Sequence, residues 1–414
     1  MKISTLVLAC TGLLSLPTSQ AADATSPFIV VFTPQAIASS ATEAAPSNGD
    51  YVRPAVRAAA QALAKRHAFS LGYVYSRAIE GFSAKLNARQ LKALLTDARV
   101  AYIEQDLPMA VLGVPEQAQG KPGGGATPAP QVLPWGIDRV EADNSVTWTN
   151  SVGPVTVTGV RAYIIDTGID TSHKDLNVVG HVNFAGGVNR DCHGHGTHVA
   201  GTVGAKDNSQ DVVGVAPGVA LVGVKVLGCG GSGTTSGVIA GVDWVTANAT
   251  APINQGQPAV ANMSLGGGAS LALDTAVLNS AAAGIFYAVA AGNSGANACL
   301  SSPARAGEGD NGVMTTAATD SADQEAYFSN YGSCVDGWAP GVYVLSTKKG
   351  GGTTTFSGTS MAAPHTAGGA ALYLSTHTAD SPATVEAALR GAAIQPGSLS
   401  KDGLPIQLLQ VDGF

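Results

Sequence analysis

Electric charge is scarce in this sequence, and long hydrophobic runs are absent beyond its first residues. Only 12% of the 414 residues are Asp, Glu, Lys or Arg, whereas about 25% is typical. The 22 basic residues form no run that could follow a phosphate backbone, and the 29 acidic residues bring the formal charge to -7. We therefore expect no nucleic-acid partner. No later segment approaches the roughly 20 apolar residues of a membrane helix, so we expect no membrane contact once the N-terminus is removed.

The N-terminus has the pattern of a secretory signal peptide. Lys2 supplies the positive charge, residues 3–16 are mostly apolar, and small residues precede a cut after Ala21. Residues 1–21 are therefore expected to direct the chain to a periplasm or out of the cell. A lipoprotein signal using Cys10 is the alternative, but the apolar stretch before that cysteine is short for one.

Cysteine is also scarce, and the few that remain suggest disulfides. Removing the signal leaves an even number of cysteines, namely Cys192, Cys229, Cys299 and Cys334. An exported chain with four cysteines is expected to form two disulfides. Three pairings are possible, and loop length alone cannot choose among them.

The first part of the expected mature chain has the element order of a small α+β domain. Apolar runs and helical spacing predict a strand at residues 28–32, a helix at 53–69 and two hairpin strands at 72–76 and 81–86. A helix capped by Asn87 and running through Leu91, Leu94 and Leu95 follows, and then a strand at 100–104. This β-α-β-β-α-β order is that of a ferredoxin-like split βαβ sandwich.

A stretch rich in Gly, Pro and Gln separates this small domain from the rest of the chain. Residues 115–131 have no apolar periodicity, which is typical of an exposed linker open to proteolysis. We therefore divide the mature chain into a small domain at 22–113, a linker at 114–131 and a larger domain at 132–414.

The larger domain alternates short apolar strands with helices. Strands are predicted at residues 160–165, 220–227, 259–265 and 284–291, and helical patterns such as 236–247 lie between them. Near-continuous Val, Ile and Ala runs are typical of parallel strands that are buried on both faces. The sequence thus predicts an α/β fold with three layers and a mostly parallel sheet.

Three motifs in this domain supply an acid, a base and a hydroxyl nucleophile. Asp166 begins an Asp-Thr-Gly motif directly after an apolar run, His195 lies between two glycines at the start of a helical pattern, and Ser360 begins the run Ser-Met-Ala-Ala-Pro. A peptide-bond hydrolase needs such a serine, an imidazole that takes its proton and a carboxylate that orients the imidazole. Taken alone, each motif is equally well a turn, a structural histidine or a helix cap.

Asn293 could complete such a hydrolase site, and the residues after Ser360 do not fit the motif of a different class of serine hydrolase. Asn293 follows the predicted strand at 284–291, where its amide could donate a hydrogen bond to a tetrahedral oxyanion. The nucleophile elbow of α/β-hydrolases would need glycine at position 362, where this chain has alanine.

The histidines of the second motif also suggest a metal site. His193, His195 and His198 resemble the H-x-H-x-D-H motif of metallo-β-lactamase-like hydrolases. However, Thr197 occupies the position where that motif has aspartate, and a zinc site needs three or four converging ligands. This metallohydrolase hypothesis is the weaker one.

Taken together, the four motifs resemble those of the subtilisin-like serine proteases, in particular the proteinase K and aqualysin group. The resemblance extends over nearly all residues from 135 to about 374. It implies a catalytic triad of Asp166, His195 and Ser360, whose chain order is that of subtilisin. It also implies an oxyanion hole formed by Asn293 and the backbone N–H of Ser360.

The resemblance further implies where extended polypeptide substrates bind. Two segments would pair with the substrate as β-strands do, through Gly231, Ser232, Gly233, Ser264, Leu265 and Gly266. The pocket for the residue before the cleaved bond, P1, would lie between residues 264–266 and 290–292. Apolar or aromatic P1 residues are expected.

Other family features are implied at the cysteines and at one aspartate. The cysteines fall where aqualysin-like proteases keep two disulfides, which favours the sequential pairing Cys192–Cys229 and Cys299–Cys334. Asp336 matches a calcium-ligand position in the group, with further ligands expected from backbone oxygens of the loop at residues 311–313. We therefore expect structural Ca²⁺ but no cofactor for catalysis. His193 departs from the family, which usually has Asn or Ser at this position.

The small domain resembles the inhibitory propeptide of the same family. Its tail would pass through the active site until the chain cuts itself, and we expect this cut near residues 112–114. The sequence therefore predicts a secreted, self-processed and monomeric serine endopeptidase of broad specificity. A catalytically inactive subtilisin fold used as a binding module is the alternative.

Overall fold

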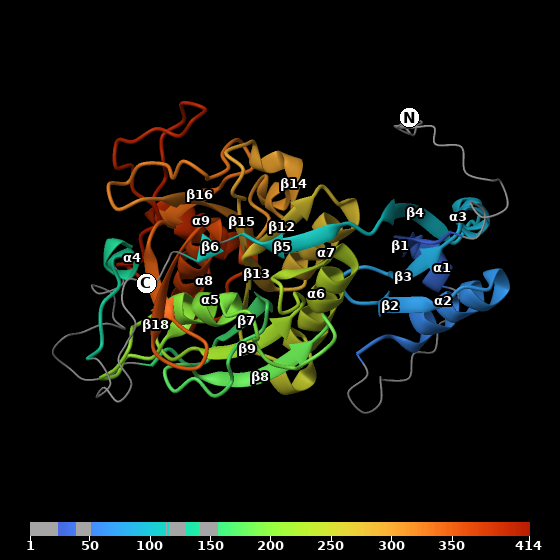
Figure 1. The fold of residues 1–414 in the computed structure, drawn as a ribbon, viewed down its shortest axis with the longest axis horizontal. Coiled ribbons are helices and arrows are strands. Elements are labelled where there is room, and N and C mark those ends of the chain that lie inside the picture. Colours follow the sequence, from blue (N-terminus) through green and yellow to red (C-terminus); the bar gives the residue numbers. More distant parts are fainter. Residues whose placement is uncertain (1–23, 39–50, 113, 116–129, 141–155) are drawn as a thin grey trace.

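The computed structural model describes residues 24–38, 51–112, 114–115, 130–140 and 156–414. The predicted signal peptide and most of the predicted linker lie outside these residues. Figure 1 shows a small N-terminal domain beside a larger domain that contains the remaining chain.

The small domain has the predicted elements in the predicted order, with one additional short helix, α1, after the first strand. Its elements are β1 (Ser26–Phe32), α1 (Pro34–Ala38), α2 (Pro54–His67), β2 (Leu71–Tyr75), β3 (Gly81–Leu86), α3 (Ala88–Leu95) and β4 (Val100–Gln105). The four strands form a sheet in the order β2-β3-β1-β4, and the pairs with β1 are antiparallel. Asn87 caps α3 as predicted, because its side chain accepts from the backbone of Gln90 while the Gln90 side chain accepts from the backbone of Asn87.

The larger domain is built on a seven-stranded parallel sheet. Its strand order is β16-β15-β13-β11-β7-β9-β8. The strands are β7 (Arg161–Asp166), β8 (Val178–Asn183), β9 (Ala220–Lys225), β11 (Ala259–Met263), β13 (Ile285–Ala290), β15 (Val313–Thr319) and β16 (Gly337–Pro340). The four predicted strands are found here as β7, β9, β11 and β13, within a few residues of their expected ends.

Helices cover both faces of this sheet, which confirms the predicted three-layer α/β fold. The long helices are α5 (His195–Gly204), α6 (Thr235–Ala249), α7 (Leu271–Ala282), α8 (Thr359–Thr376) and α9 (Pro382–Ala392). Within β7, Ala162 and Ile164 share a hydrophobic core with α5, α8 and α9, whereas Tyr163 and Ile165 share one with α6 and α7. The alternation of side chains along a strand thus assigns one helix layer to each face.

The remaining elements are short. They are α4 (Trp135–Arg139), β5 (Pro108–Val111), β6 (Val114–Pro115), β10 (Ser232–Thr234), β12 (Leu265–Gly268), β14 (Ser301–Ser302), β17 (Val344–Thr347), β18 (Thr353–Ser357) and the 3₁₀ turns η2 (Pro252–Asn254), η3 (Ala298–Leu300) and η4 (Ala304–Gly307). Within the part of the chain that the structure describes, no helix is both long enough and apolar enough to cross a bilayer.

The small domain packs against the layer formed by α6 and α7. Ile29, Val31 and Tyr75 of its sheet belong to the same hydrophobic core as these two helices. From β4 the chain crosses to the larger domain, where β5 lies as a middle strand in the order β10-β5-β12-β14 (Figure 1). Further along, β6 pairs with β18. The chain therefore runs across the face on which the predicted catalytic residues lie.

Candidate active site

Asp166 and His195 form a buried pair at the carboxyl end of the sheet. Asp166 is the last residue of β7 and His195 the first residue of α5. The Nδ1 atom of His195 lies 2.9 Å from each carboxylate oxygen of Asp166, and both side chains are almost fully buried. The backbone N–H of Thr167 also donates to Asp166 Oδ1, at 2.6 Å. The carboxylate therefore fixes the direction of the imidazole.

Glycine is required on both sides of His195. Gly194 precedes the helix with a φ of 109°, a conformation that side chains disfavour. A Cβ on Gly196 would lie 2.1 Å from the backbone oxygen of Gly168 and 3.1 Å from Asp166 Oδ1. The two glycines of the motif thus let α5 approach the end of β7 closely enough for the pair to form.

A second carboxylate, which the sequence analysis missed, holds the start of α5. The oxygens of Asp191 accept hydrogen bonds from five donors: the backbone N–H groups of His193, Gly194 and Thr197 and the hydroxyls of Thr167 and Thr197. Thr167 follows Asp166 directly. Asp191 therefore links the end of β7, which carries Asp166, to the start of α5, which carries His195. An aspartate a few residues before a helix was the available signal.

Ser360 lies at the start of α8, with its hydroxyl paired to the backbone of Ser264. Ser360 Oγ donates to the Ser264 carbonyl at 2.8 Å, and Ser264 Oγ donates to the Ser360 carbonyl at 2.8 Å. Among the described residues, the Nε2 atom of His195 has no hydrogen-bond partner. The Ser360 hydroxyl and the His195 imidazole are therefore not hydrogen-bonded to each other in this arrangement.

From the sequence, Pro364 is expected in the first turn of this helix, where proline is tolerated, and this prediction is wrong. Helix α8 begins at Thr359, so Pro364 lies inside it. Because proline has no N–H, the carbonyl of Ser360, four residues earlier, receives no helical hydrogen bond. That carbonyl is the one that accepts from Ser264 Oγ, so the proline frees an acceptor that links α8 to the segment before β12.

The carbonyl of Leu112 occupies the position expected for a reacting peptide. Asn293 Nδ2 donates to it, and the backbone N–H of Ser360 donates to it at 3.4 Å. The orientation of the Asn293 amide is set by its Oδ1 atom, which accepts from the backbone and hydroxyl of Thr359 at 2.9 and 2.8 Å. Two donors, one at the start of α8 and one in the loop after β13, therefore converge on one carbonyl oxygen.

The predicted substrate-binding segments flank the chain that leads to Leu112. Strand β5 is antiparallel to β10 and to β12, pairing Ala110 with Ser232 on one side and with Gly266 on the other. The backbone N–H of Val111 donates to the Gly231 carbonyl at 2.9 Å, and that of Leu112 lies 3.4 Å from the Ser264 carbonyl. All six predicted residues thus lie in or directly beside the strands that hold this segment.

The side chains of Met109 in β5 and of Leu112 directly after it show why glycines occur in β12. A Cβ on Gly266 would lie 2.9 Å from Leu112 Cδ1, and a Cβ on Gly267 would lie 2.5 Å from the sulfur of Met109. The Leu112 side chain therefore lies along the segment predicted to wall the P1 pocket. The Met109 side chain is buried with the core beneath α6 and α7.

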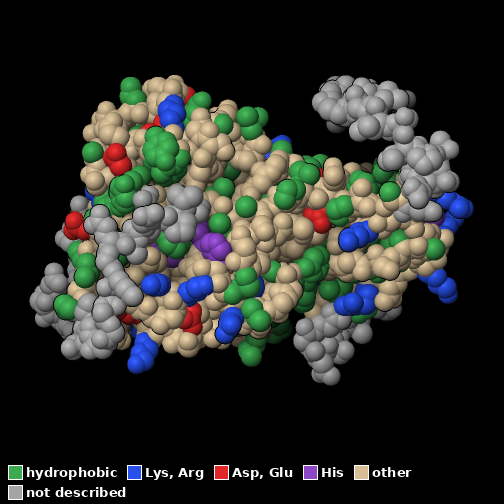
Figure 2. Space-filling view, viewed as in Figure 1, with side chains coloured by type: hydrophobic (Ala, Val, Ile, Leu, Met, Phe, Trp, Pro, Cys, Tyr) green, Lys and Arg blue, Asp and Glu red, His purple; other side chains and the backbone are tan. Residues whose placement is uncertain are grey.

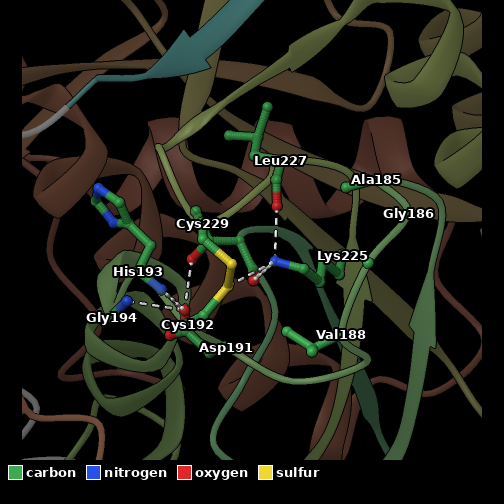
Figure 3. The surroundings of a disulfide bond; sticks show 12 residues. Ala185, Gly186, Val188, Asp191, Cys192, His193, Gly194, Lys225, Leu227 and Cys229 are labelled. Atoms are coloured by element: carbon green, nitrogen blue, oxygen red, sulfur yellow. Dashed lines mark hydrogen bonds between the residues drawn. A yellow bond between two sulfur atoms is a disulfide. The ribbon is translucent and has the colours of Figure 1, made fainter.

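Both disulfides have the predicted sequential pairing. Cys192 bonds Cys229 and Cys299 bonds Cys334, with Cα–Cα distances of 5.0 and 5.4 Å. Figure 3 shows the first bond between the segment that precedes α5 and the loop that leads to β10. The buried Lys225 lies beside it, with its Nζ donating to the carbonyls of Thr167 and Leu227.

The three histidines of the second motif do not converge on a metal. His198 Nε2 lies 3.0 Å from the Val344 carbonyl, and burial lowers the pKa of His198 to about 3. His195 is paired with Asp166. No group of three or more His, Cys, Asp or Glu residues that could hold a metal ion occurs in the described ranges. The arrangement does not support the metallohydrolase hypothesis.

Asp336 lies away from the active site in an acidic environment. Its Oδ2 atom accepts from the backbone N–H of Thr315 at 2.8 Å. Burial, followed by the nearby Glu386, raises the pKa of Asp336 to about 8. Glu386 itself accepts from the backbone of Asn311 and Gly312, in the loop that was expected to supply further calcium ligands. A half-buried carboxylate (Asp336) and a fully buried one (Glu386) are hard oxygen donors of the kind that Ca²⁺ prefers.

Comparisons with known proteins cover both domains. The profile of the subtilase family matches residues 158–408, and that of peptidase inhibitor I9 matches residues 27–111. The alkaline serine exoprotease A of Vibrio alginolyticus is 46% identical over 318 residues, which cover 76% of this chain and 55% of that protein. The extracellular serine proteinase of Thermus sp. (strain Rt41A) is 43% identical over 76% of this chain and 71% of that protein.

A solved structure agrees with these sequence matches. The crystal structure of a cold adapted subtilisin-like serine proteinase is 43% identical, covers 67% of this chain and 97% of that one, and has a TM-score of 0.58. The chain thus spans about half the length of the Vibrio relative and more of the others. The subtilase match alone extends over more than half of the chain. This chain therefore belongs to the subtilase family of serine peptidases and carries a peptidase inhibitor I9 domain at its N-terminal side.

Proposed function

We propose that this protein is a secreted serine endopeptidase that is made as a self-processing precursor. The observation that carries the proposal is the position of the Leu112 carbonyl. It accepts from Asn293 Nδ2 and Ser360 N, while the Ser360 hydroxyl lies 3.1 Å from the Leu112 backbone nitrogen. A nucleophile beside a carbonyl whose oxygen already has two donors is the geometry that acyl transfer needs.

The reaction would begin when Ser360 Oγ turns from the Ser264 carbonyl toward His195 Nε2. His195 then takes the hydroxyl proton while Oγ attacks the carbonyl carbon, and Asp166 stabilises the imidazolium. Asn293 and the Ser360 N–H hold the oxyanion. His195 returns the proton to the leaving amine, and water hydrolyses the acyl-enzyme by the same steps in reverse order.

Substrate recognition would depend mainly on backbone pairing. Strands β10 and β12 offer their edges to an extended peptide, as they do to β5, and this requires little of the peptide's sequence. The position of Leu112 beside Gly266 supports an apolar P1 residue. We propose broad specificity with apolar or aromatic P1.

The small domain would act as an intramolecular inhibitor until cleavage. Its loop after β2 binds the larger domain through Asp243 of α6, whose carboxylate accepts from the backbone of Ser76, Arg77 and Ala78. The self-cleaved bond would be Leu112–Gly113, within the predicted segment 112–114 and one residue before the predicted domain boundary. We further propose secretion through residues 1–21, a monomeric mature enzyme, no nucleic-acid or membrane partner, and structural Ca²⁺ at Asp336.

The alternative is an inactive subtilase fold that only binds peptides. It is weakened by the presence of all four chemical residues, Asp166, His195, Ser360 and Asn293, in the chain. Ser360→Ala in the full chain separates the two hypotheses. Wild-type protein should give a mature N-terminus at Gly113, cleave casein and bind a phosphonylating reagent at Ser360, whereas the variant should stay joined to its small domain.

The matched control is Ser375→Ala, which changes a serine near the other end of α8 whose hydroxyl only bonds the Leu372 carbonyl. This control should process normally. Equal processing and casein cleavage by Ser360→Ala would refute the proposed mechanism.

A further inference from the structure

His193, the residue that departs from the family pattern, lies beside the substrate segment. A methyl group at the Cα of Gly231 would lie 2.9 Å from His193 Nε2 and 3.2 Å from Val111 Cγ2. The imidazole edge and the Val111 side chain therefore flank the same glycine. If Leu112 is the P1 residue, then Val111 is P2, and His193 borders the site for the P2 side chain.

The disulfide keeps this histidine in place. Cys192 precedes His193 directly, and its partner Cys229 lies two residues before Gly231 (Figure 3). The backbone N–H of His193 is also held by Asp191, at 3.0 Å. Two constraints thus hold the imidazole against the edge of the substrate strand. Figure 2 shows histidine side chains reaching the surface of the larger domain near β6.

The imidazole presents a hydrogen-bond donor to this site. Among the described residues, the buried Nδ1 atom of His193 has no hydrogen-bond partner. A proton on Nδ1 would therefore be unsatisfied, which favours the tautomer with its proton on Nε2. Nε2 faces the side where Gly231 and the P2 residue lie. The apolar Val111 leaves this donor unused.

We propose that His193 selects the P2 residue of substrates, favouring a carboxylate over an aliphatic or cationic side chain. The proposal deepens the proposed endopeptidase function and rests on it. An N–H donor aimed at the P2 side chain can bind a carboxylate, and protonation of the imidazole turns that contact into a charge-assisted hydrogen bond.

The charges around His193 set the expected pH dependence. His195, Asp166, Asp191 and Lys349 all act on it, and burial, followed by His195, lowers its pKa. Its ring lies 6.2 Å from that of His195. A P2 carboxylate would favour the imidazolium form, so binding of an acidic P2 residue should strengthen as the pH falls. The carboxylate itself stays ionised above about pH 5.

Four peptide substrates test this on the self-processed enzyme. Each has the sequence Met-Ala-X-Leu of residues 109–112, followed by a chromogenic anilide, with Val, Asp, Asn or Lys as X. The kcat/KM ratio of the Asp to the Val peptide cancels any pH dependence of the catalytic step itself, because the same catalytic groups act on both peptides. From pH 8.5 to pH 6 we expect this ratio to rise about threefold to tenfold, and the Lys to Val ratio to fall.

Variants assign the effect to one side chain. In His193→Asn the Asp to Val ratio should be independent of pH, whereas His377→Asn, a change at an exposed histidine after α8, should keep the wild-type rise. A constant ratio in the wild type, a rise that persists in His193→Asn, or a preference for Lys would overturn the proposal. Failure of the proposed function is distinct, because the Val peptide would then not be cleaved or would be cleaved equally by Ser360→Ala.

Discussion

Asn293 is the residue whose contribution can be isolated most cleanly. Its amide has one role on each side, since Oδ1 accepts from Thr359 and Nδ2 donates to the Leu112 carbonyl. The oxyanion that forms during the reaction is a stronger acceptor than the carbonyl. In the proposed mechanism the amide would therefore stabilise the transition state more than the bound substrate.

Replacing Asn293 by alanine should lower kcat and leave KM almost unchanged. We expect a loss of about 10²-fold to 10³-fold, the size found for one such donor in subtilisin. Steady-state kinetics on a peptide anilide measure it, with Asn183→Ala, whose amide bonds only its own turn, as the control. A change mainly in KM would contradict this role, because it would show that the amide binds the substrate and the transition state equally well.

The residues of the site differ in how far the sequence reveals them. Asp166, His195, Ser360 and Asn293 lie in short motifs at strand ends or helix starts, and the joint occurrence of these motifs in one order was enough to predict them. Leu112 has no such motif, because its position depends on pairing with residues more than a hundred positions away. Asp191 has an ordinary capping signal, and only the folded chain shows that it binds Thr167 as well.

At the scale of elements, the first turns of α6 and α7 each bind one acidic side chain from the end of the small domain, in or directly after β4. Asp106 accepts from the backbone and hydroxyl of Ser236, in the first turn of α6, at 2.8 and 2.6 Å. Glu104 accepts from the hydroxyl of Ser270, the N-cap of α7, and from the backbone of Ala272 at 3.2 Å. Carboxylates are stabilising there because helix N-termini carry free N–H donors and a partial positive charge.

Removing the charge of Asp106 should weaken inhibition by the small domain. In full-length Asp106→Asn we expect the cleaved small domain to dissociate about tenfold more readily, the equivalent of one charge-assisted hydrogen bond. The lag before activity appears should therefore shorten, and less so in high salt. Glu80→Gln is the matched control, because Glu80 pairs with Arg53 within the small domain. An unchanged lag in Asp106→Asn would contradict this role.

Elements with strong local signals were predicted, and those that depend on distant partners were not. The apolar runs of β7, β9, β11 and β13 are long enough to show that they are buried on both faces. In contrast, β5 and β6 contain four and two residues, too few to show a period. They are strands because they pair with β10, β12 and β18. These partners lie far away in the sequence and come close only in the folded chain.

The whole molecule links catalysis, inhibition and folding through one continuous segment. The chain leaves the small domain after β4, and β5 then pairs between β10 and β12, the strands predicted to bind substrates. Further along, β6 pairs with β18. The precursor is therefore its own first substrate in this proposal. After the cut, the small domain would remain bound through Asp243 and the caps of α6 and α7, so release is a separate step from cleavage.

The stability of the larger domain should depend on pH and calcium together. Burial raises the pKa of Asp336 to about 8 and that of Glu386 to about 7 in the folded chain, above their ordinary values near 4. The folded state thus holds protons that the unfolded state releases, so without a cation the free energy of unfolding falls as the pH rises from about 4 to 8. A bound Ca²⁺ would offset the negative charge of the ionised carboxylates, so the free energy of unfolding would decrease less as the pH rises.

Calorimetry on Ser360→Ala protein, which cannot digest itself, tests this coupling. At pH 8 we expect calcium at about 100 times its dissociation constant to add about 2.7 kcal/mol, or a Tm increase of roughly 5–10 °C over the chelated protein. At pH 5 the increase should be smaller, because protons already neutralise the two carboxylates. Asp336→Asn should remove the calcium response, whereas Asp412→Asn, at an exposed position, should keep it. An equal response in both variants would place the ion elsewhere.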